Sequence, residues 1–397
     1  MREWQASRDK KLVQRRLEMI PIDKLLMGGD SGQSARRFAR LTGDLLRPST
    51  QMCDSPHVKL LQEWNCKGDD VFQKENFEKT AYYNNAMTNI DLFGTYFDAR
   101  TEDDVVHGAK RFVDCYQGVQ SNNIHQQGQS ASDDPIRVRP VQYSDCLHVV
   151  DGHHRVAIAC ARGESTVRAL PVGPEVLTPL QEMLLEVMWL KGRKELYQPV
   201  DFPELRKEWV LVRRCEDRLR KMTAFLEQQR IDNGSYLDVG SSYGWFVAKM
   251  NSLGYDAHGV ERDPIANLIG HTVYNLDNSR LTRSECSRFL ANNPSQYDIV
   301  SSFSVLHHFV LGNGRVNAQE FARLLDNCTR RVLFFETGQE TEKWYRQRLS
   351  GWSPAFIEEW LKASTSFTKI VSLGIDEDDK PPFEGNFGRT LFACLRT

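Results

Sequence analysis

Short apolar runs alternate with amphipathic, helix-length segments throughout the C-terminal half of the chain. The runs lie at residues 236–239, 257–260, 298–302 and 331–335, and a fifth at 389–395 lies near the C-terminus. This alternation is typical of a parallel sheet, in which each buried strand is followed by a covering helix. Residues 231–397 are therefore predicted to form an α/β domain with a Rossmann-like sheet and helices on both faces.

Apolar residues at helical spacing precede this predicted sheet. They recur at three- and four-residue intervals from residue 177 to 190, and a second amphipathic run spans residues 209–226. Such spacing is typical of packing helices. Residues 176–230 are therefore predicted to be a helical connector.

The first 175 residues show a mixture of strand and helix patterns. Strand-like runs at 135–140, 147–150 and 166–170 surround a helix pattern at 156–162, which ends at a glycine. Another strand-like run at 19–25 is separated from these by a long insert, residues 30–134. Within the insert, residues 121–134 are polar and are predicted to be a surface loop. The patterns predict an α+β domain over residues 1–175.

Composition limits what these domains do. A chain of 397 residues exceeds one ordinary core, and its net charge of −2 argues against a strongly basic nucleic-acid surface. No apolar stretch is long enough to span a bilayer, and the N-terminus lacks the apolar core of a signal peptide. The nine cysteines show no metal-ligand spacing, so we expect free thiols and no metal site. We expect a soluble, cytoplasmic protein, and its oligomeric state stays open.

A glycine-containing turn follows the first apolar run of the C-terminal half. Gly240 permits a positive φ and a close ligand approach, and Gly244 lets the next helix begin beside the turn with its N–H groups toward a ligand. Glu261 ends the following apolar run, 23 positions after Asp238. A carboxylate there can accept hydrogen bonds from both ribose hydroxyls of an adenosine cofactor.

The Asp-x-Gly-x-x-x-Gly turn resembles that of class I S-adenosylmethionine-dependent methyltransferases, over roughly residues 233–397. It differs from the Gly-x-Gly-x-x-Gly of dinucleotide dehydrogenases. The resemblance implies S-adenosylmethionine as cofactor and a Rossmann-like fold. It also implies five cofactor-binding residues, with the last at the ribose: Asp238, Gly240, Ser241, Gly244 and Glu261.

Residues 305–309, Val-Leu-His-His-Phe, resemble a stretch of many small-molecule methyltransferases that lies next to the methyl group. His307 and His308 are therefore candidate catalytic residues, with packing and capping as the alternative. Methyl transfer from a sulfonium needs mainly in-line approach and a dry pocket, so a base matters only for a hydroxyl acceptor. The Asn/Asp-Pro-Pro-Tyr/Phe tetrapeptide of nucleic-acid amino-methylating enzymes is absent. Glu336, at the end of another run, either holds an acceptor or a cation or is a solvated carboxylate.

A second candidate site lies in the first 175 residues, at Asp151-Gly152-His153-His154-Arg155. The segment precedes a predicted helix, whose N-terminus favours an anion, and arginine adds bidentate phosphate recognition. Asp151 and the two histidines would bind a metal only with further ligands, and none converge in the sequence.

This box, with Pro-Ile-x-Val-x-Pro before it and Gly-x-x-Thr-Val-x-Ala after it, resembles the ParB and sulfiredoxin superfamily over roughly residues 19–173. The resemblance implies that Gly152, His154 and Arg155 bind nucleotide phosphates. It makes Asp151 and His153 candidate catalytic residues if the domain transfers phosphate from ATP with Mg²⁺. No cysteine lies in the box and no helix-turn-helix follows it, which disfavours sulfinic-acid reduction and DNA segregation. A scaffold without ligand is the alternative.

The long insert is not accounted for by that resemblance. Its aromatic residues either form a sugar-stacking surface or belong to a core: Tyr82, Tyr83, Phe93, Tyr96 and Phe97. Residue type alone marks four further candidates for acid or base chemistry: Asp54, His57, Glu63 and Glu75.

Three functional hypotheses fit two nucleotide-handling domains. In the first, the N-terminal domain phosphorylates and the C-terminal domain methylates one acceptor, by analogy with the domain architecture of enzymes that cap bacterial glycans. In the second, the N-terminal domain only binds a phosphorylated acceptor, and in the third it is a nucleotide-gated regulatory module. The expected acceptor is a small molecule or glycan, and nucleic acid is disfavoured. The acceptor's identity, the nucleotide and the role of the insert stay open.

Overall fold

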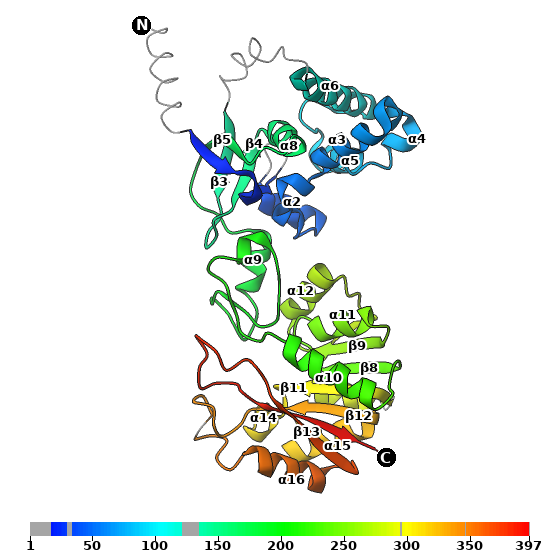
Figure 1. The fold of residues 1–397 in the computed structure, drawn as a ribbon, viewed down its shortest axis with the longest axis vertical. Helices are drawn as coiled ribbons and strands as arrows, with labels where there is room; N and C mark the ends of the chain where they lie inside the picture. The colour runs from blue at the N-terminus through cyan, green and yellow to red at the C-terminus, as the bar shows by residue number, and fades with distance from the viewer. Residues whose placement is uncertain (1–16, 30–33, 121–134, 294–295, 346, 397) are drawn as a thin grey trace. The chain divides into compact units, whose positions relative to one another are not determined.

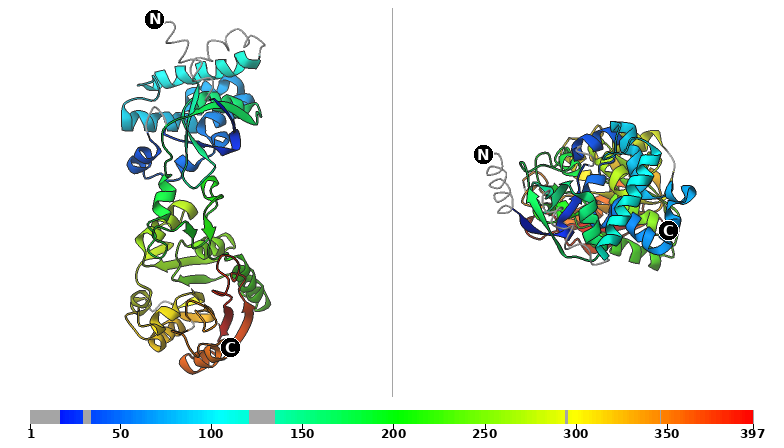
Figure 2. Two further views of the ribbon diagram at one scale, coloured as in Figure 1. Left: turned by 90° about the vertical axis from the view of Figure 1, so that its left-hand side faces the viewer. Right: turned by 90° about the horizontal axis from the view of Figure 1, so that it is seen from above.

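The computed structural model describes residues 17–29, 34–120, 135–293, 296–345 and 347–396. Contacts divide the chain into a first unit (Met1–Glu182 and Asp201–Glu208) and a second unit (Met183–Val200 and Trp209–Thr397). Figures 1 and 2 show the ribbon from three directions. The predicted loop at 121–134 lies outside the described residues. None of the described helices combines the length and apolar character that crossing a membrane requires.

The first unit contains a mixed five-stranded sheet in the order β1-β5-β3-β4-β2. The pairs β3–β5 and β2–β4 are parallel, and the other two pairs are antiparallel. The strands are β1 (Glu18–Pro21), β2 (Leu25–Met27), β3 (Ile136–Pro140), β4 (Leu147–Asp151) and β5 (Thr166–Pro171). The run predicted as one strand at 19–25 is two strands separated by a 3-10 turn, η1 (Ile22–Lys24).

The insert is helical and packs beside α8 (His153–Ala161), which directly follows β4. Buried apolar residues of α3, α5 and α6 form one core with Ala157 of α8. Ser55 caps α3, because its hydroxyl accepts the Val58 N–H and Pro56 occupies the first turn. The helical elements are α2 (Ala35–Thr42), η2 (Arg47–Ser49), η3 (Met52–Asp54), α3 (Pro56–Lys67), η4 (Gly68–Phe72), α4 (Lys74–Phe77), α5 (Ala81–Phe93) and α6 (Glu102–Gln120).

The segment predicted as a helical connector is α-helical only near its ends. It contains α9 (Pro179–Leu184), η5 (Pro203–Leu205) and α10 (Glu216–Gln228). Between them lie two paired two-residue strands, β6 (Glu195–Leu196) and β7 (Val210–Leu211). Proline, which disrupts helix interiors, occurs at positions 199 and 203, so the apolar spacing here does not produce one continuous helix.

The second unit contains a seven-stranded sheet in the order β10-β9-β8-β11-β12-β14-β13. All neighbouring pairs are parallel except those made by β14, which runs antiparallel to β12 and β13. The strands are β8 (Ser235–Val239), β9 (Asp256–Glu261), β10 (Leu281–Arg283), β11 (Tyr297–Phe303), β12 (Thr329–Glu336), β13 (Lys369–Ile375) and β14 (Thr390–Leu395). The predicted Rossmann-like α/β fold is confirmed.

Alternating side chains divide the core between the two faces of this sheet. Tyr236 and Phe334 belong to a core with α10 and α11, whereas Leu237 and Phe335 belong to the opposite core with α13, α15 and α16. The helices are α11 (Trp245–Ser252), α12 (Pro264–Tyr274), α13 (Cys286–Asn292), α14 (Leu306–Val310), α15 (Ala318–Cys328) and α16 (Pro354–Ser364). Burial on both faces explains why the strands are nearly continuous apolar runs.

Strand order reverses between β8 and β11, because β9 and β10 lie on one side of β8 while β11 and β12 lie on the other. In open α/β sheets, ligands bind outside the carboxyl ends of the strands at such a switch point. The fold therefore predicts a ligand site among the residues that follow β8, β9, β11 and β12.

Candidate active site

A cavity of about 670 Å³ lies at this switch point and is built entirely from the second unit. Its size is that of a small-molecule site. One end is lined by residues that follow β8, β9 and β10, including Gly240, Ser242, Glu261, Asp263 and Glu285. The other end is lined by residues that follow β11 and β12 or precede β14: Ser304, His307, Tyr345, Arg348, Phe387 and Arg389. We call these six residues the acceptor end.

Gly240 and Gly244 hold the turn after β8 in a shape that other residues would not tolerate. Their φ angles are +78° and +80°. A Cβ at Gly240 would lie 2.5 Å from Cγ2 of Val305, and one at Gly244 would lie 2.6 Å from Cδ1 of Leu276. Both glycines are therefore required by backbone conformation and by space, and the Gly240 backbone lines the cavity.

Glu261 ends β9 and lies at the cavity wall. One carboxylate oxygen accepts the N–H groups of Arg262 (2.7 Å) and Asp263 (2.8 Å), and the other accepts the Ser242 N–H (3.0 Å). These three bonds fix the carboxylate, while burial raises its pKa. The structure thus brings Glu261 and Gly240 to one cavity, as the sequence motif predicts.

Asp238 and Ser241 do not line this cavity. Asp238 is 2% exposed and accepts a 2.6 Å hydrogen bond from the Ser301 hydroxyl, and burial raises its pKa to about 7. It borders a small adjoining hollow together with Gly240. Ser241 is fully buried against Gly259, where a Cβ would come within 2.8 Å of its hydroxyl oxygen. Ser242, which the sequence analysis did not single out, lines the cavity instead.

Both candidate histidines of the second unit line the cavity. His307 is buried, and its Nδ1 accepts the Gly338 N–H at 3.2 Å. Burial holds the pKa of His307 well below its usual value, and burial lowers that of His308 to about 4. The rings of His308 and the half-exposed Trp189 lie 4.7 Å apart. At neutral pH both imidazoles are therefore uncharged.

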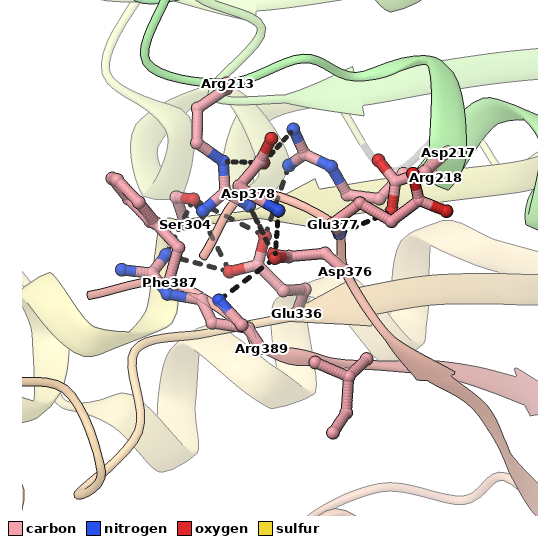
Figure 3. A network of polar contacts seen from close by, with 12 residues as sticks. Arg213, Asp217, Arg218, Ser304, Glu336, Asp376, Glu377, Asp378, Phe387 and Arg389 are labelled. Carbon is pink, nitrogen blue, oxygen red and sulfur yellow. Dashed lines mark hydrogen bonds and ion pairs between the residues drawn. The ribbon is translucent and has the colours of Figure 1, made fainter. Parts of the chain in front are cut away.

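Glu336 is the centre of a buried ionic network (Figure 3). It is 0% exposed, so its interpretation as a solvated carboxylate is wrong. One carboxylate oxygen accepts hydrogen bonds from Arg213 (2.7 Å) and Arg218 (3.3 Å), and the other from Arg389 (2.8 Å). Burial alone would raise the pKa of Glu336, but the three arginines lower it to about 2.

Three further carboxylates complete the network. Glu342 accepts two hydrogen bonds from Arg389 and also the N–H groups of Gln339 and Phe387. Asp376 and Asp378 pair with Arg213. The network therefore ties the loop after β12 to the loop before β14, and these two loops form much of the acceptor end.

In the first unit, the Asp151–Arg155 box is divided between two environments. Gly152 has a φ of +96° and precedes α8. Asp151 and Arg155 are partly exposed, with 3.5 Å between carboxylate and guanidinium. His153, by contrast, is 1% exposed.

Both histidines of the box face aromatic and histidine residues of the insert. The His153 ring lies 5.7 Å from that of the buried His57, and the Tyr82 hydroxyl lies 3.1 Å from Nε2 of His154. Tyr82 and Tyr96 are each 2% exposed, so they are core residues and not a sugar-stacking surface.

Of the remaining insert candidates, Phe97 also lies beside the box, with its ring centroid 4.8 Å from that of His154. Tyr83 and Phe93 are half-buried and Phe97 is exposed, while Glu63 pairs with Lys67. Asp54 and Glu75 are exposed. No cluster of three potential metal ligands occurs in the described part of the chain.

One protein-family profile matches part of the chain. A family profile described as "Methyltransferase domain" matches residues 211–366. No curated protein matches the sequence.

Several solved structures are similar to part of the chain at low identity. The bifunctional kinase-methyltransferase WbdD is 18% identical, with a TM-score of 0.43, over 54% of this chain and 46% of that one. The aligned region thus spans about half the length of WbdD. The methyltransferase domain of bacterial CtHen1-CN is 15% identical over 46% of this chain and 98% of that one, with a TM-score of 0.34. Magnesium protoporphyrin IX methyltransferase (ChlM) from Synechocystis PCC 6803, solved with bound SAM, is 15% identical over 45% of this chain and 79% of that one. Its TM-score is 0.33. On the evidence of the family match, residues 211–366 carry a methyltransferase domain.

Proposed function

We propose that the second unit is an S-adenosylmethionine-dependent methyltransferase whose cofactor lies across the ends of β8 and β9. The observation that carries the proposal is the turn at Gly240, where a side chain would fill the space beside Val305 at the cavity wall. Gly240 would approach the methionine part, and Glu261, fixed by three backbone N–H groups, would accept the ribose hydroxyls. These residues fit the cofactor.

When bound, the cofactor supplies an electrophilic methyl group. The protein's own contribution is orientation and exclusion of water, because methyl transfer gains most from in-line approach in a dry site. Phe303, Val305 and Phe387 supply apolar walls at the switch point. The ionic network around Glu336 and Glu342 holds the loops that carry the acceptor end.

Glu261→Ala tests the cofactor site. We expect calorimetry to show micromolar binding of S-adenosylmethionine to the wild type, about −8 kcal/mol. The variant should lose about 1–3 kcal/mol of binding free energy, the usual value for a hydrogen bond to a charged group. Asp277→Ala is the matched control, because Asp277 also accepts two backbone N–H groups but lies outside the cavity lining. Equal binding by the wild type and Glu261→Ala would refute the ribose assignment.

For the first unit we propose a nucleotide-phosphate site at Gly152, His154 and Arg155, with ATP and Mg²⁺ as ligands. The left-handed Gly152 at the start of α8 and the partly exposed Arg155 support it. If the site transfers phosphate to a small-molecule or glycan acceptor, Asp151 is the catalytic carboxylate. His153 then only supports the box, because it is buried against His57.

A thermal-shift series with ATP, ADP, CTP and GTP in the presence of Mg²⁺ tests this second proposal. A nucleotide that binds the folded chain raises its unfolding temperature. No stabilisation at millimolar nucleotide would leave the first unit as a scaffold. Stabilisation without nucleotide turnover would favour a unit that only binds phosphorylated ligands or regulates the second unit.

A further inference from the structure

The acceptor end of the cavity offers hydrogen-bond donors and a positive charge. Arg348 lines it and is an exposed residue, and among the described residues no carboxylate pairs with its side chain. Tyr345 lines it with a phenol whose pKa is raised, mainly by burial, so the hydroxyl keeps its proton.

His307 belongs to the same donor set. Its Nδ1 already accepts the Gly338 N–H, so the neutral ring carries its proton on Nε2. The free nitrogen of the ring is therefore a donor and has no lone pair with which to remove a proton from an acceptor.

The two carboxylates that bond Arg389 of the acceptor end, Glu336 and Glu342, have hydrogen bonds at both oxygens. Arginines occupy both oxygens of Glu336, and those of Glu342 accept hydrogen bonds from Arg389 and two backbone N–H groups.

The four carboxylates that line the cavity itself are also bonded. Glu195 pairs with Arg193. Glu261, at the end of β9, Asp263, after it, and Glu285, after β10, each accept backbone N–H groups. Within the described residues, the acceptor end thus presents donors and no free carboxylate base.

We propose that the methyl acceptor is an oxyanion, a phosphate monoester or a carboxylate, held by Arg348, Tyr345 and the Nε2–H of His307. The inference rests on the proposed cofactor site and specifies its substrate class. A lone pair of the anionic oxygen forms the new O–CH₃ bond while the C–S bond of the sulfonium breaks, and that electron pair stays on sulfur. One positive and one negative charge disappear together and no proton is released, so this chemistry needs no base. A hydroxyl or ammonium acceptor would have to lose a proton.

Phenyl phosphate, benzoate and phenol are suitable probes, because Tyr345 and Phe387 line the same end and favour an aromatic ring. The full chain, saturated with S-adenosylhomocysteine, is titrated with each probe in a calorimeter. We expect at least one anion to bind ten or more times tighter than phenol. The tighter of the two anions identifies the phosphate or carboxylate class.

Arg348→Gln should weaken binding of that anion about tenfold and leave S-adenosylhomocysteine binding unchanged. Arg323→Gln is the control, because Arg323 lies on α15 paired with Glu320, outside the cavity lining. Phenol binding as tightly as both anions, or no anion binding to the loaded protein, would overturn the oxyanion assignment alone. Absence of S-adenosylhomocysteine binding to the wild type would overturn the cofactor site and, with it, this inference.

Discussion

Replacing Gly240 with alanine separates two effects of a side chain in the turn after β8. The first is backbone strain, because Gly240 has a φ of +78°, and the left-handed conformation costs other residues about 1–2 kcal/mol. The second is crowding, because the new Cβ would lie 2.5 Å from Cγ2 of Val305. Overpacking of this kind costs about 1–3 kcal/mol more. Gly240→Ala should therefore lower the free energy of unfolding by about 2–5 kcal/mol.

Gly254 provides a matched control. Its φ is +91°, but a Cβ there meets nothing within 4 Å. Gly254→Ala should therefore cost only the strain, about 1–2 kcal/mol. Both variants are followed by urea unfolding, using the transition that S-adenosylmethionine shifts to higher urea.

Cofactor affinity gives the second readout of the same pair of variants. Gly240→Ala should bind S-adenosylmethionine at least tenfold more weakly, whereas Gly254→Ala should bind it like the wild type. Equal stability losses in the two variants, or wild-type affinity in Gly240→Ala, would refute the steric argument.

Four further outcomes follow from the structure. Glu342→Gln should lower the free energy of unfolding by about 3–5 kcal/mol, because it removes one of the carboxylates that pair with the buried Arg389. A loss below about 1 kcal/mol in urea unfolding would contradict this. Asp238 has a pKa raised to about 7 by burial, so the stability it contributes is present below its unfolded pKa near 4 and is lost as pH rises through 7. Asp238→Asn should therefore gain stability relative to the wild type as pH rises from about 4 to about 7, and parallel pH profiles would exclude this titration. Arg155→Ala should abolish nucleotide-induced thermal shifts while calorimetry shows unchanged S-adenosylmethionine binding, and a retained shift would remove Arg155 from the phosphate site. Asp151→Asn should keep nucleotide binding and stop phosphate transfer, whereas full turnover by this variant would mean that Asp151 only pairs with Arg155 and takes no part in catalysis.

Local sequence patterns predicted the parts of the site that lie on one strand and its turn. Gly240 and Gly244 follow β8 and Glu261 ends β9, so motif and spacing are sufficient to bring Gly240 and Glu261 to one cavity. Ser241 shows the limit of this reasoning. Neighbouring residues of a turn face different ways, and here Ser242 lines the cavity while Ser241 packs against Gly259.

Long-range ionic pairing escaped the sequence analysis. Glu336 was open to interpretation as a solvated carboxylate because its partners Arg213 and Arg389 are 123 and 53 positions away. No local sequence pattern indicates that the side chains of these two arginines are buried. The same holds for His153, whose orientation is set by His57 of the insert, 96 positions earlier in the sequence. Contacts between residues far apart in the sequence determine where such side chains lie. Composition and periodicity do not reveal which distant residues come into contact.

We propose that the second unit binds one molecule of S-adenosylmethionine in the cavity beside Gly240. Native mass spectrometry of the full chain with increasing S-adenosylmethionine tests it most directly. We expect one bound cofactor per chain in the wild type and none in Gly240→Val, with both proteins folded by circular dichroism. Equal cofactor occupancy of the two proteins, or no cofactor on the wild type at millimolar concentration, would contradict it.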